Sequence, residues 1–219
     1  MYVPAAPAPS APTLAPAGIV STALLAAPPI GVSASTGLSI RRAELNVLEG
    51  HAATVSGALH GDPRSPGLSD RVVTLQGLGS HGWRALARAR TSAGGRFRLR
   101  YFPHRIGSER VRLRFAGDAH DLGTHRRLGQ LNVYRLAGAS WYGGGGGLAC
   151  GGSLTSSTLG VANKTLPCGT LVTLRYGGRS VRVPVVDRGP YVAGREFDLT
   201  QATKQALGFG DTGEVWSTR

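Results

Sequence analysis

The chain has 219 residues, enough for one large domain or two small ones, and its formal net charge is +13. Its 33 Gly and 13 Pro residues indicate many turns, and therefore β-strands rather than long helices. A basic chain attracts phosphates or carboxylates, but this sequence contains no DNA- or RNA-binding motif, so nucleic acid is not expected as its partner. Beyond the N-terminal region, no segment is long and apolar enough to predict a membrane-spanning helix.

Residues 1–38 are rich in Ala, Pro, Ser and Leu and carry no charge. The apolar run 18–27 and the small residues 32–34 resemble the core and the cleavage site of a signal peptide, but the usual basic stretch before the core is missing. The alternative is an Ala/Pro-rich disordered linker next to a membrane anchor. We expect an exported protein of the cell envelope, which is not an integral membrane protein unless this segment is an uncleaved anchor.

Residues 39–136 are expected to form a β-sandwich. Six short apolar or alternating segments are separated by turn residues at intervals of roughly ten residues, as in sandwich domains. They are 54–59, 72–76, 83–90, 96–101, 111–115 and 130–134. Gly82-Trp83, the turn at 91–97 and the sequence 115–118 resemble parts of bacterial immunoglobulin-like modules, which implies a spacer or binding role without chemistry.

In two of these segments, 96–101 and 111–115, apolar residues alternate with arginine. Because successive side chains of a strand point to opposite faces, the arginines are expected on an outer face. They are Arg96, Arg98 and Arg100 together with Arg110, Arg112 and Arg114. If the two strands are neighbours, they form one arginine-covered surface, which is either simply solvated or a binding surface for anionic polymers.

Residues 139–219 contain four motifs in a compact order: Ala139-Ser-Trp-Tyr-Gly143, Lys164-Thr-Leu-Pro-Cys-Gly-Thr170, Asp187-Arg-Gly-Pro-Tyr191 and Phe197-Asp-Leu-Thr200. Strands are expected at 171–176 and 179–186, joined by a Gly177-Gly178 hairpin turn. A short helix at 201–207, with Thr200 as N-cap and Gly208 as stop, is expected before a last strand around 214–216.

In this order and spacing, the motifs resemble the six-stranded double-psi β-barrel of the rare lipoprotein A (RlpA)-like family, which is related to expansins and barwin-like proteins. The resemblance implies a mainly β protein that binds peptidoglycan glycan strands and remodels them, as septal lytic transglycosylases do. Non-catalytic, expansin-like polysaccharide binding and a structural module that recruits partners remain alternatives. The resemblance implies no cofactor, and anionic wall polymers become candidate partners of the arginine surfaces.

Cleavage of a glycosidic bond needs a proton delivered to the leaving oxygen, usually by a carboxylic acid. Asp187 is the predicted catalytic residue, because it follows an apolar strand and opens a Gly-Pro turn; the alternative is that it only caps this turn. Asp198 is the second carboxylate, predicted either to contact substrate or to cap the helix entry. The family pattern has a Glu where Gly152 stands and a His where Asn163 stands, and Asn163 cannot transfer a proton near neutral pH.

Sugar sites combine aromatic rings with planar polar groups. The predicted substrate-binding residues are accordingly Trp141, Tyr142, Asn163, Arg188 and Tyr191, in addition to Asp198. Trp141 and Tyr142 are adjacent, so one of them is expected on the buried side of its strand.

Cys150 and Cys168 are the two cysteines of the chain. In an exported protein they are expected to form a disulfide, whereas in a cytosolic protein they would be buried thiols. A zinc site is not expected, because four ligands are normally needed and no His is nearby in the sequence.

Overall fold

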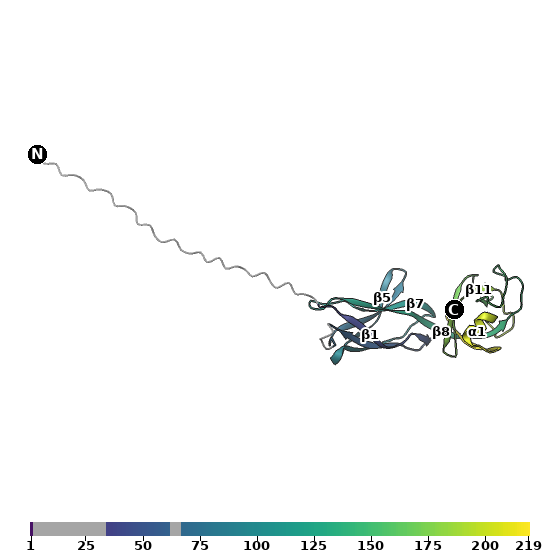
Figure 1. The fold of residues 1–219 in the computed structure, drawn as a ribbon, viewed down its shortest axis with the longest axis horizontal. Helices are drawn as coiled ribbons and strands as arrows, with labels where there is room; N and C mark the ends of the chain where they lie inside the picture. Colours follow the sequence, from purple (N-terminus) through teal and green to yellow (C-terminus); the bar gives the residue numbers. More distant parts are fainter. Residues whose placement is uncertain (2–33, 62–66) are drawn as a thin grey trace. The chain divides into compact units, whose positions relative to one another are not determined.

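The computed structural model describes Met1 and residues 34–61 and 67–219, so the predicted signal-like segment 1–38 lies outside the described residues except for Met1 and residues 34–38. In the described part the protein is mainly β, as predicted, with one α-helix, α1 (Gln201–Leu207) (Figure 1). No helix among these residues has the length and apolar character needed to cross a bilayer.

Two sheets enclose the first hydrophobic core. The strands are β1 (Gly37–Glu44), β2 (Asn46–Leu48), β3 (Ala53–His60), β4 (Val72–Gly79), β5 (Gly82–Arg90), β6 (Arg96–Tyr101), β7 (Gly107–Phe115) and β8 (Thr124–Tyr142). One sheet has the order β1–β3–β6, and in the other β5, β4, β7 and β8 follow one another, with β2 parallel to β8. All six segments predicted from the alternation fall on these strands, while β1 and β2 were not predicted.

The core between the sheets consists of the apolar side chains of the alternating strands. Val55 and Leu99 of one sheet and Leu75, Leu113 and Leu131 of the other are at most 1% exposed. Burial of each such side chain stabilises the fold by about 1.5–3 kcal/mol relative to exposure. Two sheets around one core agree with the sandwich prediction, while the immunoglobulin-like character of this part remains a prediction.

The arginines of β6 and β7 lie outside this core, as the alternation predicted. The condition for one joint arginine surface is not met, because β6 is hydrogen-bonded to β3 whereas β7 lies between β4 and β8 in the other sheet. Since both sheets turn their apolar faces to the same core, the two rows of arginine are on separate outer faces.

The second half of β8 belongs to a closed barrel. β8 pairs with β7 through residues 124–133 and with β13 through residues 135–140. The other barrel strands are β9 (Val161–Ala162), β10 (Leu171–Tyr176), β11 (Arg179–Asp187), β12 (Phe197–Thr200) and β13 (Thr212–Ser217). Pairing runs β8–β12–β9–β11–β10–β13 and returns to β8, so six strands close on themselves, as the predicted double-psi barrel requires.

The barrel has its own core and the predicted local signals. Val172, Leu174, Val183, Phe197 and Val215 are fully buried inside it. The hairpin between β10 and β11 turns at two glycines with φ of 54° and 86°, which a two-residue turn of this kind needs. The N-cap of α1 accepts a hydrogen bond from the Thr203 amide, and the glycine after the helix is left-handed, which confirms the predicted helix with both its ends.

Candidate functional site

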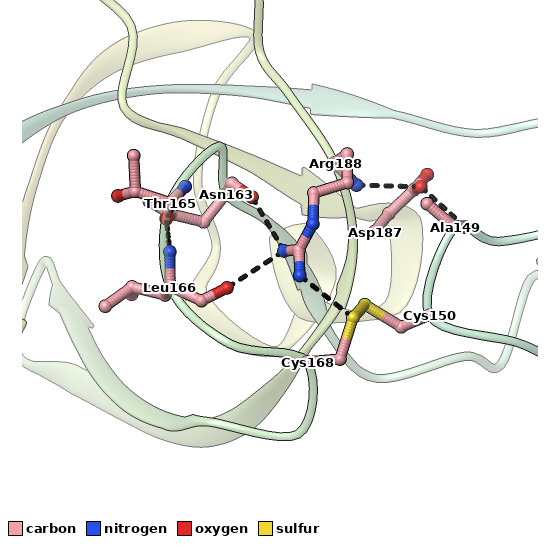
Figure 2. The surroundings of a disulfide bond; sticks show 8 residues. All are labelled: Ala149, Cys150, Asn163, Thr165, Leu166, Cys168, Asp187 and Arg188. Carbon is pink, nitrogen blue, oxygen red and sulfur yellow. Dashed lines mark hydrogen bonds between the residues drawn. A yellow bond between two sulfur atoms is a disulfide. The ribbon is translucent and has the colours of Figure 1, made fainter.

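Asp187 is the last residue of β11, where the chain leaves the barrel for a turn. Its Oδ1 accepts hydrogen bonds from the amides of Ala149 (2.9 Å) and Arg188 (2.8 Å) (Figure 2). Its carbonyl accepts one from the Asn163 amide (3.1 Å). Oδ2 accepts no hydrogen bond of ordinary geometry from the described residues, and the hydroxyl of Tyr142 lies close to the carboxylate. The turn-capping alternative therefore accounts for one oxygen only, and the other remains available to a ligand.

The predicted disulfide joins the two loops beside Asp187. Cys150 and Cys168 are bonded, with Cα atoms 5.5 Å apart, so the glycine-rich loop is tied to the turn after the Lys-Thr-Leu-Pro motif (Figure 2). The Cys150 amide also donates to the Val186 carbonyl (3.1 Å). The position of Asp187 is thus fixed by its own strand and by two cross-linked loops.

The guanidinium of Arg188 binds one of these two loops, the one that carries Cys168. Nη1 donates to the carbonyls of Asn163 (3.1 Å) and Leu166 (2.9 Å), and Nη2 lies 3.0 Å from the Cys168 sulfur (Figure 2). All three contacts are with the loop 163–168, so Arg188 stabilises this loop as one wall of the site. Its predicted contact with substrate remains a prediction.

Asn163 is 3% exposed, and its side chain is used within the protein. Its Oδ1 accepts from the amides of Thr165 (3.1 Å) and Leu166 (2.8 Å), and its Nδ2 donates to the Glu196 carbonyl (3.1 Å). Both lone pairs of the amide oxygen are occupied, so this side chain determines the shape of the loop. The sequence did not show this, because Glu196 is distant along the chain.

Tyr142, Ser140 and Asp198 extend the site along β8 and β12. The two strands are parallel, with Ser140 opposite Asp198 and Tyr142 opposite Thr200, so these side chains share one face. The Ser140 hydroxyl donates to Asp198 and accepts from Arg195 (3.3 Å). The helix-capping alternative for Asp198 is wrong, because Thr200 caps α1 instead.

The Tyr142 hydroxyl is buried and makes no hydrogen bond of ordinary geometry among the described residues. Burial is the main reason why its pKa is raised, and the negative charge of Asp187, a hydrogen-bonding contact with Asp187 and the charge of Asp198 raise it further, in this order. The phenol therefore stays protonated at neutral pH and faces the two carboxylates as a neutral donor. An unpaired buried hydroxyl between two acids is the most unusual polar feature of the barrel.

Trp141 points away from Tyr142, since adjacent strand residues face opposite sides. It is 37% exposed, its Nε1 donates to Asp211 (2.9 Å), and Lys204 lies 3.9 Å from the centre of its ring and pairs with Asp211 (2.8 Å). Lys204 and Asp211 were missed, because only the tertiary structure brings α1 and the following loop to this ring. The pKa of the exposed Asp211 is lowered, mainly by its hydrogen bond with Lys204 and next by its hydrogen bond with Trp141.

Tyr191 is the most accessible aromatic residue of the predicted set. It is 79% exposed in the loop after β11, and the Lys164 ammonium lies 5.9 Å from its ring centre. The Gly152 position, where the family pattern has Glu, is exposed with φ of 82° and has open space around it. The structure thus brings Asp187, Tyr142, Asp198 and the Arg188–Asn163 loop together, while Trp141 faces another side of its strand.

The described residues contain no group of three or more His, Cys, Asp or Glu side chains that could hold a metal ion. The arrangement instead provides carboxylates, a neutral phenol and exposed aromatic rings. Such groups can transfer protons and bind sugars.

A closed barrel with this strand order and these motifs defines the class of double-psi β-barrels. Residues 136–216 match the sequence pattern of the family described as "Lytic transglycolase". These residues therefore form an RlpA-like double-psi β-barrel, and this family assignment concerns the barrel and not the strands before it.

Several curated relatives are similar to this part of the chain, including the following two. The "Probable endolytic peptidoglycan transglycosylase RlpA" of Aquifex aeolicus is 45% identical over 75 residues, which cover 32% of this chain and 33% of the relative. The "Endolytic peptidoglycan transglycosylase RlpA" of Pseudomonas aeruginosa (strain UCBPP-PA14) is 36% identical over 96 residues, which cover 41% and 28%. The chain thus spans about a third of the length of the curated relatives that it matches.

Among solved structures, the "Streptomyces papain inhibitor (SPI)" is 24% identical, with a TM-score of 0.31, over 38% of this chain and 91% of the inhibitor.

Proposed function

We propose that the barrel binds peptidoglycan glycan strands outside the cytoplasm and that Asp187 transfers the proton when a glycosidic bond is cleaved. The observation that carries this proposal is the position of Asp187. Asp187 ends a strand of a barrel whose sequence is similar to proteins named peptidoglycan transglycosylases. One oxygen of its carboxylate accepts hydrogen bonds from two amides, and the other accepts none of ordinary geometry and can face a ligand.

The reaction can proceed with one principal acid. The protonated carboxyl of Asp187 donates its proton to the glycosidic oxygen as the bond to the anomeric carbon breaks. The carboxylate then accepts the proton of a hydroxyl group on the same sugar, whose oxygen forms a new bond to the anomeric carbon. The products are a shortened strand and an anhydro-sugar end, and no water is consumed.

The neighbouring groups have supporting roles in this scheme. Tyr142 remains a neutral phenol, because burial and the nearby carboxylates raise its pKa, and it can donate a hydrogen bond to the charged form of Asp187. Tyr191 offers an exposed ring to an apolar sugar face. Asn163 and Arg188 hold the loop that forms one wall.

Non-catalytic glycan binding is the second candidate. The observation in its favour is that Gly152 supplies no carboxylate and that Asn163 is committed to its own loop. A barrel that lacks these two groups keeps its aromatic and polar binding residues. The domain division at 39–136 and 139–219 also remains a proposal, supported by two cores that share no residue.

Asp187→Asn separates the two candidates. Purified sacculi are incubated with the full chain, anhydro-sugar products are measured by mass spectrometry, and binding is measured by co-sedimentation. If the chain cleaves, the variant should lose about 10²–10⁴-fold in product formation but still bind, because Asn keeps hydrogen-bonding ability. Glu214→Gln is the matched control, since it removes one exposed carboxylate from β13.

The outcomes are distinct. No product from either protein, with binding retained, leaves the binding candidate. Cleavage that persists in Asp187→Asn refutes the role of Asp187 and makes Asp198 the next residue to test. If the wild-type protein does not co-sediment with sacculi, both candidate functions are contradicted.

A further inference from the structure

A groove of about 810 Å³ runs over the outer face of the three-stranded sheet β1–β3–β6. Its floor is formed by the central strand β3, through Thr54, Ser56 and Ala58. These side chains point outward, because Val55 and Leu59 between and after them are buried in the core. Because the outward side chains of the central strand are small, the middle of this sheet face is a depression.

Arginine side chains of the two edge strands, β1 and β6, form the sides of the groove. The register of β1 against β3 shifts between Ile40 and Arg42, which makes Arg41 an extra residue, and both Arg41 and Arg42 line the groove. On the other side, Arg96 and Arg98 of β6 lie opposite Ala58 and Ser56. The β-bulge thus places two consecutive arginines on one rim, facing two on the other.

The positive charge of the groove is largely uncompensated. Glu44 is the one acidic residue in its lining, and it already pairs with Arg42 and accepts a hydrogen bond from Thr54 (3.0 Å). Arg41, Arg96 and Arg98 are exposed and form no ion pair with any described residue. Unpaired arginines also lie on the other sheet, where Arg88, Arg110 and Arg114 form no ion pair with any described residue, but they do not line this groove.

We propose that this groove binds a linear phosphodiester polymer of the cell wall, with its phosphates held between the two rows of arginine. Arginine forks bind phosphate oxygens in pairs. Arg96 and Arg98 are two residues apart, or about 6.6 Å along the strand, and the rims are two strand spacings, about 9.6 Å, apart. A narrow polyol phosphate chain fits a floor of small residues, whereas a polyuronate carries a bulky sugar ring at every charge.

One other observation favours this ligand over a nucleic acid. Proteins that bind single strands stack bases on exposed aromatic rings. The aromatic residue in the groove lining is Phe97, which is 5% exposed and packs in the core. The choice of a wall polymer rests on the proposed function of the barrel, but the groove itself lies on other strands and is tested separately.

The test uses the full chain and fluorescently labelled poly(glycerol phosphate). The triple variant Arg41→Gln/Arg96→Gln/Arg98→Gln should bind about tenfold more weakly, as expected for the loss of three partly solvated charge pairs. Binding of the wild type should also weaken as salt rises. The matched control is Arg88→Gln/Arg110→Gln/Arg114→Gln, which removes the same charge from the other sheet and should change affinity less than threefold.

Several results would overturn the proposal. An equal loss in the control triple would mean a diffuse charge effect, and equal affinity for polygalacturonate would contradict the preference for phosphodiesters. Tighter binding of an oligothymidine would point to nucleic acid. If circular dichroism shows that the groove triple is unfolded, Ser56→Glu replaces it, because a carboxylate between Arg42 and Arg98 should also weaken binding about tenfold.

The barrel proposal can fail independently of this one. Asp187→Asn should bind poly(glycerol phosphate) like the wild type, and the groove triple should release as much anhydro-sugar from isolated glycan strands as the wild type. Polymer binding without any sedimentation on sacculi freed of anionic polymers would refute the function of the barrel alone.

Discussion

Removal of the Cys150–Cys168 disulfide should destabilise the barrel measurably. The bridge joins residues 18 positions apart. In the chain-entropy description, opening a loop of this length costs roughly 3 kcal/mol, because the unfolded chain regains the freedom that the cross-link removed. For a chain of this size, each kcal/mol lowers Tm by about 2–4 °C, so the double variant Cys150→Ser/Cys168→Ser should melt about 6–12 °C lower.

The effect should be concentrated at the site. The loop that carries Cys150 also gives the Ala149 amide to Asp187 Oδ1 and the Cys150 amide to Val186. Without the cross-link these two hydrogen bonds hold the loop alone, so both amides should exchange their hydrogens faster in the variant. Amides in the core strand β4 of the first core serve as an internal control.

Thermal unfolding is followed by tryptophan fluorescence, with Trp141 and Trp216 in the barrel and Trp83 in β5. Reductant should lower Tm of the wild type toward that of the double variant and leave the variant unchanged. A double variant that melts within about 2 °C of the oxidised wild type would refute the reasoning, because less than 1 kcal/mol would then come from the cross-link.

Two further predictions concern single side chains in the barrel. Thr200→Ala should lower the free energy of unfolding by about 1–2 kcal/mol, because the hydroxyl accepts a hydrogen bond from the Thr203 amide and also donates to the Gly160 carbonyl (3.1 Å). In denaturant titrations, the control Thr200→Ser should keep most of this free energy. A loss as large in Thr200→Ser as in Thr200→Ala would contradict the capping role. Tyr142→Phe should cost less stability at neutral pH than Tyr134→Phe, because the Tyr142 hydroxyl makes no hydrogen bond of ordinary geometry. Tyr134→Phe should cost about 1 kcal/mol through its bond to Asn46 (2.8 Å). Because the pKa of Tyr142 is raised in the fold, the wild type should lose stability as pH rises above about 10, the ordinary value, and Tyr142→Phe should lose less; an identical alkaline loss would contradict this.

Much of the barrel could be predicted, because its signals are local. A Gly-Gly pair between two apolar runs specifies a hairpin, and a Thr before and a Gly after a short run specify a helix with both its ends. The disulfide followed from an even cysteine count and the expectation of export. Asp187 could be placed at the end of its strand from the Gly-Pro turn that follows it, although its catalytic role is still a proposal.

The roles of the polar residues around Asp187 could not be predicted in the same way. Asn163 was expected to face a sugar, but it is buried against residues of its own loop and against Glu196. Asp198 was considered a helix cap, yet it lies two residues before the N-cap Thr200 and accepts a hydrogen bond from Ser140. Glu196 and Ser140 are distant from Asn163 and Asp198 along the chain, and only the pairing of strands across the barrel brings them into contact.

The alternation of arginine and apolar residues in the sequence determined which side of β6 and β7 is buried, because the period of a strand is set by its own backbone. Only the tertiary structure decided which strands are neighbours: β6 joined β1 and β3, and β7 joined β4 and β8. Pairing is chosen by the burial of all apolar faces at once, which no segment specifies alone. For that reason the groove between Arg41 and Arg98 became visible only in the folded chain.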